Sequence, residues 1–188
     1  MSRFVDRGAI TAAYVGIGMA VTIGVSFLLV IPIEPIYWLL APLAGLLIGY
    51  YANQRSNRTR DSWRRVVANS LFAGLVTGLT LAALLLAVKA LFFVADDGYR
   101  DASLGGPISC STGADCVYQR YLIAGEGPQL EAIGVTDVGS FSRFYWNQQL
   151  TTAGLLLLIT TGSGLLGGLA YAVTRPPGER AIAEQPTA

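Results

Sequence analysis

The sequence predicts an all-α membrane protein in which four transmembrane helices form an antiparallel bundle. A small extracytoplasmic cap is expected in the loop between the third and fourth helices. Charged residues make up only 13% of the 188-residue chain and hydrophobic residues 53%, whereas a soluble domain carries about 25% charged residues. Four long apolar stretches also lack internal charges, so they do not show the 3.6-residue alternation typical of helices on a soluble protein.

A helix that crosses the hydrocarbon core of a bilayer needs about 20 mostly apolar residues. The stretches that qualify are 9–31, 36–52, 66–88 and 150–174. The first is too long for the apolar part of a typical signal peptide, so we expect it to remain as a span, with cleavage as the alternative. Pro42 is expected to kink or break the second helix, because its ring removes a backbone donor.

The arginines predict the orientation, because cytoplasmic segments of membrane proteins are enriched in Lys and Arg. With four crossings, one side of the membrane receives Arg3, Arg7, Arg55, Arg58, Arg60, Arg64, Arg65, Arg175 and Arg180. We therefore place both termini in the cytoplasm, at the plasma membrane. In this interpretation residues 1–188 form one transmembrane domain, with an extracytoplasmic loop at 95–149 and a flexible cytoplasmic tail at 175–188.

The loop between the second and third spans is the most basic part of the chain. It holds Arg55, Arg58, Arg60, Arg64 and Arg65. The first role expected of these arginines is to fix topology within the lipid bilayer. They are also expected to attract anionic lipid headgroups, at about 1 kcal/mol each near the surface.

Small residues recur at four-residue spacing in all four spans, which allows helix backbones to approach closely in lipid. The glycines of this pattern are Gly16, Gly24, Gly45, Gly49, Gly74, Gly78, Gly164 and Gly168. We favour packing within one bundle over a dimer interface, because every span carries the pattern. The stretch 45–49 also resembles 164–168, which raises the alternative of a duplicated hairpin.

The predicted outer loop contains both cysteines, Cys110 and Cys116. An oxidising compartment favours a structural disulfide, and the spacing differs from that of redox-active Cys-x-x-Cys pairs. Residues 117–124 and 140–149 are expected to form short helices, the second with aromatic side chains against the lipid headgroups. At the same predicted depth, Glu34 and Lys89 are hypothesised to form an ion pair that closes the outer end of the bundle.

The layout of a short first outer loop and a long second outer loop with cysteines resembles that of tetraspanin-like proteins. The Cys-Cys-Gly signature of that family is missing, and the inner loop here is longer and more basic. The likeness is one of layout alone, and we assign no family.

Recognisable chemistry is sparse. The chain has no histidine and a net charge of +1, so we expect no nucleic-acid partner, and we expect no cofactor, metal or catalytic residue. The favoured function is an accessory or structural subunit of a membrane complex, bound to other membrane subunits or to copies of itself. The alternative is a small oligomeric transporter or channel for an uncharged or small solute, and a membrane enzyme ranks last. Transport would use polar groups among Thr22, Ser26, Asn69, Ser70, Thr77, Thr80, Thr160, Thr161 and Ser163.

Overall fold

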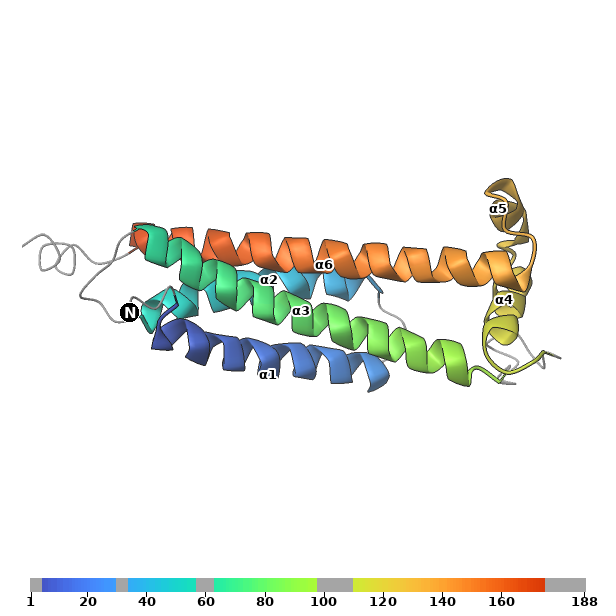
Figure 1. Cartoon of the computed structure of the whole chain (residues 1–188), viewed down its shortest axis with the longest axis horizontal. Helices are drawn as coiled ribbons and strands as arrows, with labels where there is room; N and C mark the ends of the chain where they lie inside the picture. Colours follow the sequence, from blue (N-terminus) through green and yellow to red (C-terminus); the bar gives the residue numbers. More distant parts are fainter. Residues whose placement is uncertain (1–4, 30–33, 57–62, 98–109, 175–188) are drawn as a thin grey trace, which may run out of the picture. The chain divides into compact units, whose positions relative to one another are not determined.

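The computed structural model describes residues 5–29, 34–56, 63–97 and 110–174, with the backbone alone for 26–29 and 34–37. All regular structure in these ranges is helical (Figure 1). The helices are α1 (Arg7–Leu29), α2 (Glu34–Gln54), α3 (Trp63–Ala95), α4 (Ala114–Ile123), α5 (Gly127–Ala132) and α6 (Val138–Thr174). The all-helical class predicted from the sequence is therefore confirmed.

The chain divides into two compact units, and the division falls within α3 and within α6. The first unit comprises residues 1–84 and 153–188, and the second comprises residues 85–152. Both long helices thus contribute residues to both units. Each unit is described by itself below.

Among the described residues, three helices are long and apolar enough to cross a membrane. These segments are Arg7–Val25, Trp63–Ala95 and Val138–Thr174. At 1.5 Å per residue, the 19 residues of the first segment extend about 28 Å, close to the roughly 30 Å of a bilayer core. The other two segments, of 33 and 37 residues, extend about 50 and 56 Å and are longer than a bilayer core. The chain therefore has the composition of a membrane protein over most of its helical length.

Helix packing in the first unit depends on close backbone approach. α1 lies against α2, where a Cβ added to Gly8 would lie 2.5 Å from the backbone carbon of Arg55. α6 approaches α3 at Gly74, where an added Cβ would lie 3.2 Å from the Cα of Thr161. Larger residues at these positions would separate the helices, which is why small residues are found there.

The second unit has its own apolar core. Its buried residues are Phe93, Val117, Tyr118, Leu130, Val135, Phe141 and Tyr145. Phe141 is completely buried, and its ring centroid lies 5.0 Å from that of Tyr121 and 5.1 Å from that of Tyr118. Tyr145 stacks on Phe93 at 4.7 Å. This core joins the end of α3, helix α4 and the beginning of α6.

Glycines end both short helices of the second unit. After α4, Gly125 has φ +86° and the Glu126 N–H donates to the Tyr121 carbonyl. After α5, Gly134 has φ +80° and the Val135 N–H donates to the Leu130 carbonyl. Both are Schellman motifs, in which the left-handed residue is almost always glycine because it has no Cβ.

Asp137 determines where α6 begins. Its carboxylate accepts the Ser140 N–H at 2.9 Å, while the Ser140 hydroxyl accepts the Asp137 N–H at 3.1 Å. This reciprocal pair resembles a capping box and satisfies backbone donors in the first turn. The backbone N–H of Ser140 is also the main cause that holds the pKa of Asp137 below its ordinary value of 3.8.

The helices differ from the expected spans in three places. Residues 140–149 do not form a separate short helix but belong to α6, since no residue between Ser140 and Leu150 interrupts the helical backbone. α2 continues through Pro42 instead of breaking there. The aromatic residues Phe141 and Tyr145, expected to face lipid headgroups, are buried in the core of the second unit, because Phe141 packs on tyrosines of α4 and Tyr145 stacks on Phe93 of α3.

Candidate functional site

A polar cluster joins the beginning of α1, the end of α2 and the beginning of α3. The Ser56 hydroxyl donates to the carboxylate of Asp6, and the Asn69 amide donates to the Ser56 oxygen at 3.4 Å. The Asp6 N–H in turn faces the Asn69 side-chain oxygen at 3.5 Å. We call these three residues the inner polar cluster. Asn69 is completely buried and Ser56 is 8% exposed, so their hydrogen bonds are needed to offset the cost of burial.

Asp6 has two roles in the inner polar cluster. Its carboxylate accepts the Ala9 N–H at 3.1 Å, which makes Asp6 the N-cap of α1. Burial acts to raise the pKa of Asp6, but hydrogen bonds from Ser56, Ala9, Asn69 and Gly8 outweigh it. The net effect places its pKa below the ordinary value of 3.8, so Asp6 is an anion at neutral pH.

A second polar contact lies between α2 and α3. The Asn53 amide donates to the Ser70 hydroxyl at 2.7 Å and to the Gly49 carbonyl at 2.9 Å. The Ser70 hydroxyl in turn donates a hydrogen bond to the Val66 carbonyl at 2.8 Å. α6 covers this contact through Gly168, where an added Cβ would lie 2.9 Å from the Ser70 Cβ. The Asn53–Ser70 hydrogen bond therefore joins α2 and α3 at a point where α6 presents a glycine, which has no side chain.

All eight glycines predicted to pack lie against a neighbouring helix. Gly16 meets Thr77 and Gly24 meets Leu84, while Gly78 meets Leu157. The remaining five form the contact of α6 with α2 and α3: Gly45, Gly49, Gly74, Gly164 and Gly168. Each contact lies within the first unit. The distinction between this packing and an additional dimer interface stays a prediction, because the structure holds one copy.

The hydroxyl groups considered for a transport path mostly bond to their own helices. The Thr77, Thr80 and Thr160 hydroxyls donate to carbonyls four residues earlier at 2.7–2.9 Å. Ser163 donates to the Thr160 carbonyl at 3.0 Å, and Thr22 to the Gly18 carbonyl at 3.0 Å. Among the described side chains, Thr161 has a buried hydroxyl oxygen without a hydrogen-bond partner. The side chain of Ser26 lies outside the described residues.

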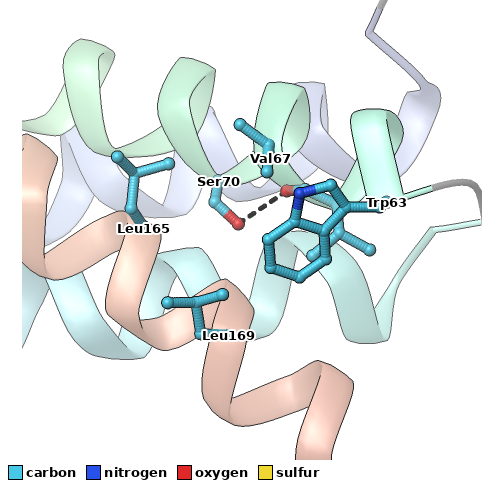
Figure 2. Close-up of a pocket in the computed structure, with 6 residues that line it drawn as sticks. Trp63, Val67, Ser70, Leu165 and Leu169 are labelled. Carbon is cyan, nitrogen blue, oxygen red and sulfur yellow. Dashed lines mark hydrogen bonds between the residues drawn. The ribbon is translucent and has the colours of Figure 1, made fainter.

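A pocket of about 180 Å³ lies between α3 and α6 (Figure 2). It is lined by Trp63, Val66, Val67, Ser70, Leu165 and Leu169. We call it the α3–α6 groove. Figure 2 shows Leu165 and Leu169 reaching into it from α6, with Trp63 at the end where α3 begins. Ser70 has its hydroxyl directed at the backbone of its own helix, so the lining is apolar apart from the indole N–H of Trp63.

The predicted basic loop is described in part. Arg55 lies over the ring of Tyr51 at 5.5 Å, a cation–π arrangement. Arg64 is exposed and Arg65 is half-buried in the first turn of α3. Arg58 and Arg60 lie outside the described residues. The role of this loop in topology and lipid binding stays a prediction.

Two further residue pairs were predicted from the sequence, a disulfide and an ion pair. Cys110 and Cys116 are disulfide-bonded, with Cα atoms 5.0 Å apart. The hypothesised Glu34–Lys89 ion pair is not tested, because the side chain of Glu34 lies outside the described residues. An ion pair that the sequence did not reveal joins the Arg120 guanidinium to the Asp96 carboxylate through two contacts, at 2.7 and 3.1 Å.

The inner polar cluster was also missed from the sequence, although it had a local signal. Asp6 lies three residues before the apolar stretch that begins at residue 9, and an aspartate just before such a stretch is a typical N-cap signal. Ser56 lies four residues after the second apolar stretch and just past the end of α2, and composition does not reveal that its hydroxyl turns toward Asp6. Over the described part of the chain, no group of three or more His, Cys, Asp or Glu residues could hold a metal ion.

Comparison of the chain with protein-family models, with curated proteins and with solved structures finds no match. The proposals below therefore depend on the chain's own residues.

Proposed function

We propose that this chain is a four-span integral membrane protein that acts as an accessory or structural subunit of a membrane complex and carries out no chemistry of its own. Both termini are cytoplasmic in this proposal, the membrane is the plasma membrane, and the second unit forms an extracytoplasmic cap. The four spans form an antiparallel bundle from α1, α2, α3 and α6.

The length of α2 supports its inclusion as the fourth span. Its 21 residues extend about 31 Å at 1.5 Å per residue, which equals the thickness of a typical hydrocarbon core. α2 carries Leu39, Leu43 and Leu47 on exposed positions, where they would meet lipid. Four crossings also place the described cations Arg7, Arg55 and Arg64 on one side of the membrane, as the positive-inside rule requires.

One observation carries the assignment of a subunit role. Most described hydroxyl groups inside the first unit donate to helix backbone carbonyls, and its amides bond to neighbouring side chains. A conducting path needs polar groups that remain available to the solute. The α3–α6 groove is apolar, which favours binding of an apolar partner over passage of a polar solute. These features support the subunit function over the transporter alternative.

The test compares partner retention with solute flux. Full-length chain is extracted from its native membrane in mild detergent, and its assembly is measured by native mass spectrometry. We expect one membrane protein, or further copies of this chain, at a fixed stoichiometry. In reconstituted vesicles, we expect glycerol and urea to equilibrate as slowly as in vesicles without protein. Protein-dependent solute flux together with a partner-free monomer would contradict the proposal.

A further inference from the structure

We propose that the α3–α6 groove binds one acyl chain of an anionic phospholipid whose headgroup phosphate is held by Arg64 and Arg65. This inference rests on the proposed insertion of the chain into a membrane, and it names a partner for that function. The occupant is a single lipid molecule of the leaflet next to the basic loop.

The groove is suited to a hydrocarbon chain. Val66 and Val67 line it from α3, and Leu165 and Leu169 line it from α6. The hydroxyl of Ser70 donates to the Val66 carbonyl and accepts from Asn53. Its hydrogen bonds are therefore made within the protein, and a bound molecule does not need to supply a polar group. An apolar group that enters such a site loses no hydrogen bond and removes apolar surface from other contacts.

Charge beside the groove selects an anionic amphiphile. Arg64 and Arg65 directly follow the lining residue Trp63, and the first turn of α3 contains no acidic residue. The long side chains of arginine can extend toward the membrane surface while their stems cover apolar atoms. Trp63 is 58% exposed, as expected for a ring at the boundary of hydrocarbon and headgroups. The amphipathic Trp63 and the two arginines share the first turn of α3, and the apolar lining residues Val66 and Val67 follow them. One end of the groove is therefore next to polar and cationic groups and the rest is apolar, as a phospholipid with its headgroup at one end and its acyl chain beyond requires.

The size of the groove argues for a lipid over a second protein chain. It has six lining residues, whereas a stable protein–protein interface uses about 20–30 residues on each side. Its volume of about 180 Å³ accommodates part of one acyl chain. A protein partner would need to extend far beyond the groove.

Fluorescence quenching by brominated lipids tests the proposal on the full chain. Trp63 becomes the only tryptophan through Trp38→Phe and Trp146→Phe. The protein is reconstituted in phosphatidylcholine, and increasing fractions of phosphatidylglycerol with bromines on the acyl chains are added. We expect Trp63 quenching to saturate at a low mole fraction of brominated phosphatidylglycerol, whereas brominated phosphatidylcholine should quench in proportion to its mole fraction.

Two sets of variants assign the signal to the groove. Arg64→Gln and Arg65→Gln should each reduce the preference for phosphatidylglycerol about fivefold, since each arginine near a membrane surface contributes about 1 kcal/mol. Val67→Phe fills the groove and should abolish the saturable quenching. The matched control Leu166→Phe adds the same ring on α6 at a position that is 57% exposed and does not line the groove, so quenching should be retained.

The outcomes separate this proposal from the membrane assignment. Leu79, in the middle of α3, is 51% exposed, and Leu79→Trp in a chain without other tryptophans reports on lipid contact alone. If this reporter is quenched by both lipids but Trp63 shows no preference, the lipid site is overturned while membrane insertion stands. An unquenched reporter overturns both. A change in oligomeric state on Val67→Phe, with lipid quenching intact, would assign the groove to a second copy and overturn the lipid site.

Discussion

Gly49 of α2 lies directly on the backbone of Gly164 of α6. A Cβ added to Gly49 would overlap the Gly164 carbonyl oxygen and lie 2.7 Å from its carbonyl carbon. The two glycines belong to the similar stretches 45–49 and 164–168, and these stretches therefore pack on one another. Near this contact, the rings of Tyr50 and Tyr171 meet edge to face at 5.6 Å.

Alanine in this contact should destabilise the first unit. Gly49→Ala and Gly167→Ala each place a methyl group on backbone atoms, of Gly164 and Leu46 respectively, which cannot move aside as a side chain can. We expect each variant to lose about 1–3 kcal/mol of stability, measured by thermal unfolding in detergent. Gly162→Ala on α6 is the matched control, because nothing lies within 4 Å of its added Cβ. It should unfold at the same temperature or higher, since alanine favours helix. Equal losses in all three variants would contradict the proposed packing.

Asp6 should contribute stability that depends on pH in a defined direction. Its folded-state pKa lies below its ordinary value of 3.8, so the contribution is present above about pH 4 and is lost as the pH falls through the folded-state pKa. Asp6→Ala removes the N-cap of α1 and should cost about 1 kcal/mol at pH 7. Asp6→Asn keeps a capping side chain and should flatten the acid side of the stability profile. A profile that is identical for wild type and Asp6→Asn down to pH 2 would exclude this role.

The Arg120–Asp96 ion pair should hold the second unit in a defined conformation. The guanidinium uses Nε and Nη2 to contact both carboxylate oxygens, a fork that lysine cannot reproduce. Arg120→Lys should therefore increase hydrogen exchange of backbone amides in α4 by several-fold. Arg143→Lys provides the control, because Arg143 is an exposed residue of the same unit. Unchanged exchange in the Arg120 variant would show that the pair is replaceable.

The disulfide closes a short loop in front of α4. In the chain-entropy model, a loop of this size stabilises by roughly 2 kcal/mol. When the intact protein is treated with an alkylating reagent in the absence of a reductant, we expect neither cysteine to be modified. The double variant Cys110→Ser and Cys116→Ser should become sensitive to proteases near Gly113, while the first unit keeps its thermal stability. Two free thiols in protein isolated from the membrane would contradict the expected oxidising location.

The presence and approximate place of the four long helices could be predicted, because each contains an uncharged apolar stretch of about the length that a membrane span needs. The beginning of α6 could not, since composition changes near Leu150 whereas the helix depends on the cap at Asp137. α5 was missed as well, although Pro128 in its first turn and Gly134 after its end are ordinary boundary signals. α2 continues through Pro42, and helices of membrane proteins tolerate a proline where neighbouring groups satisfy the freed carbonyl.

The candidate sites were harder to predict than the helices. Asn53 and Ser70 are 17 residues apart, and their hydrogen bond depends on how α2 and α3 are rotated about their axes. The α3–α6 groove likewise forms only because residues of two different helices, such as Trp63 and Leu169, line the same pocket. Periodicity within one helix does not reveal which helix it packs against. The glycines were easier to predict, because close approach in lipid requires small side chains at a regular spacing.

The most direct test of the four-span assignment locates two loops relative to the membrane. Reporter tags are inserted separately at Arg58, in the basic loop, and at Gly125, an exposed glycine that ends α4. The four-span assignment predicts that the tag at residue 58 is cytoplasmic and the tag at residue 125 is outside. Both tags in one compartment, or a chain that stays in solution without detergent, would contradict it.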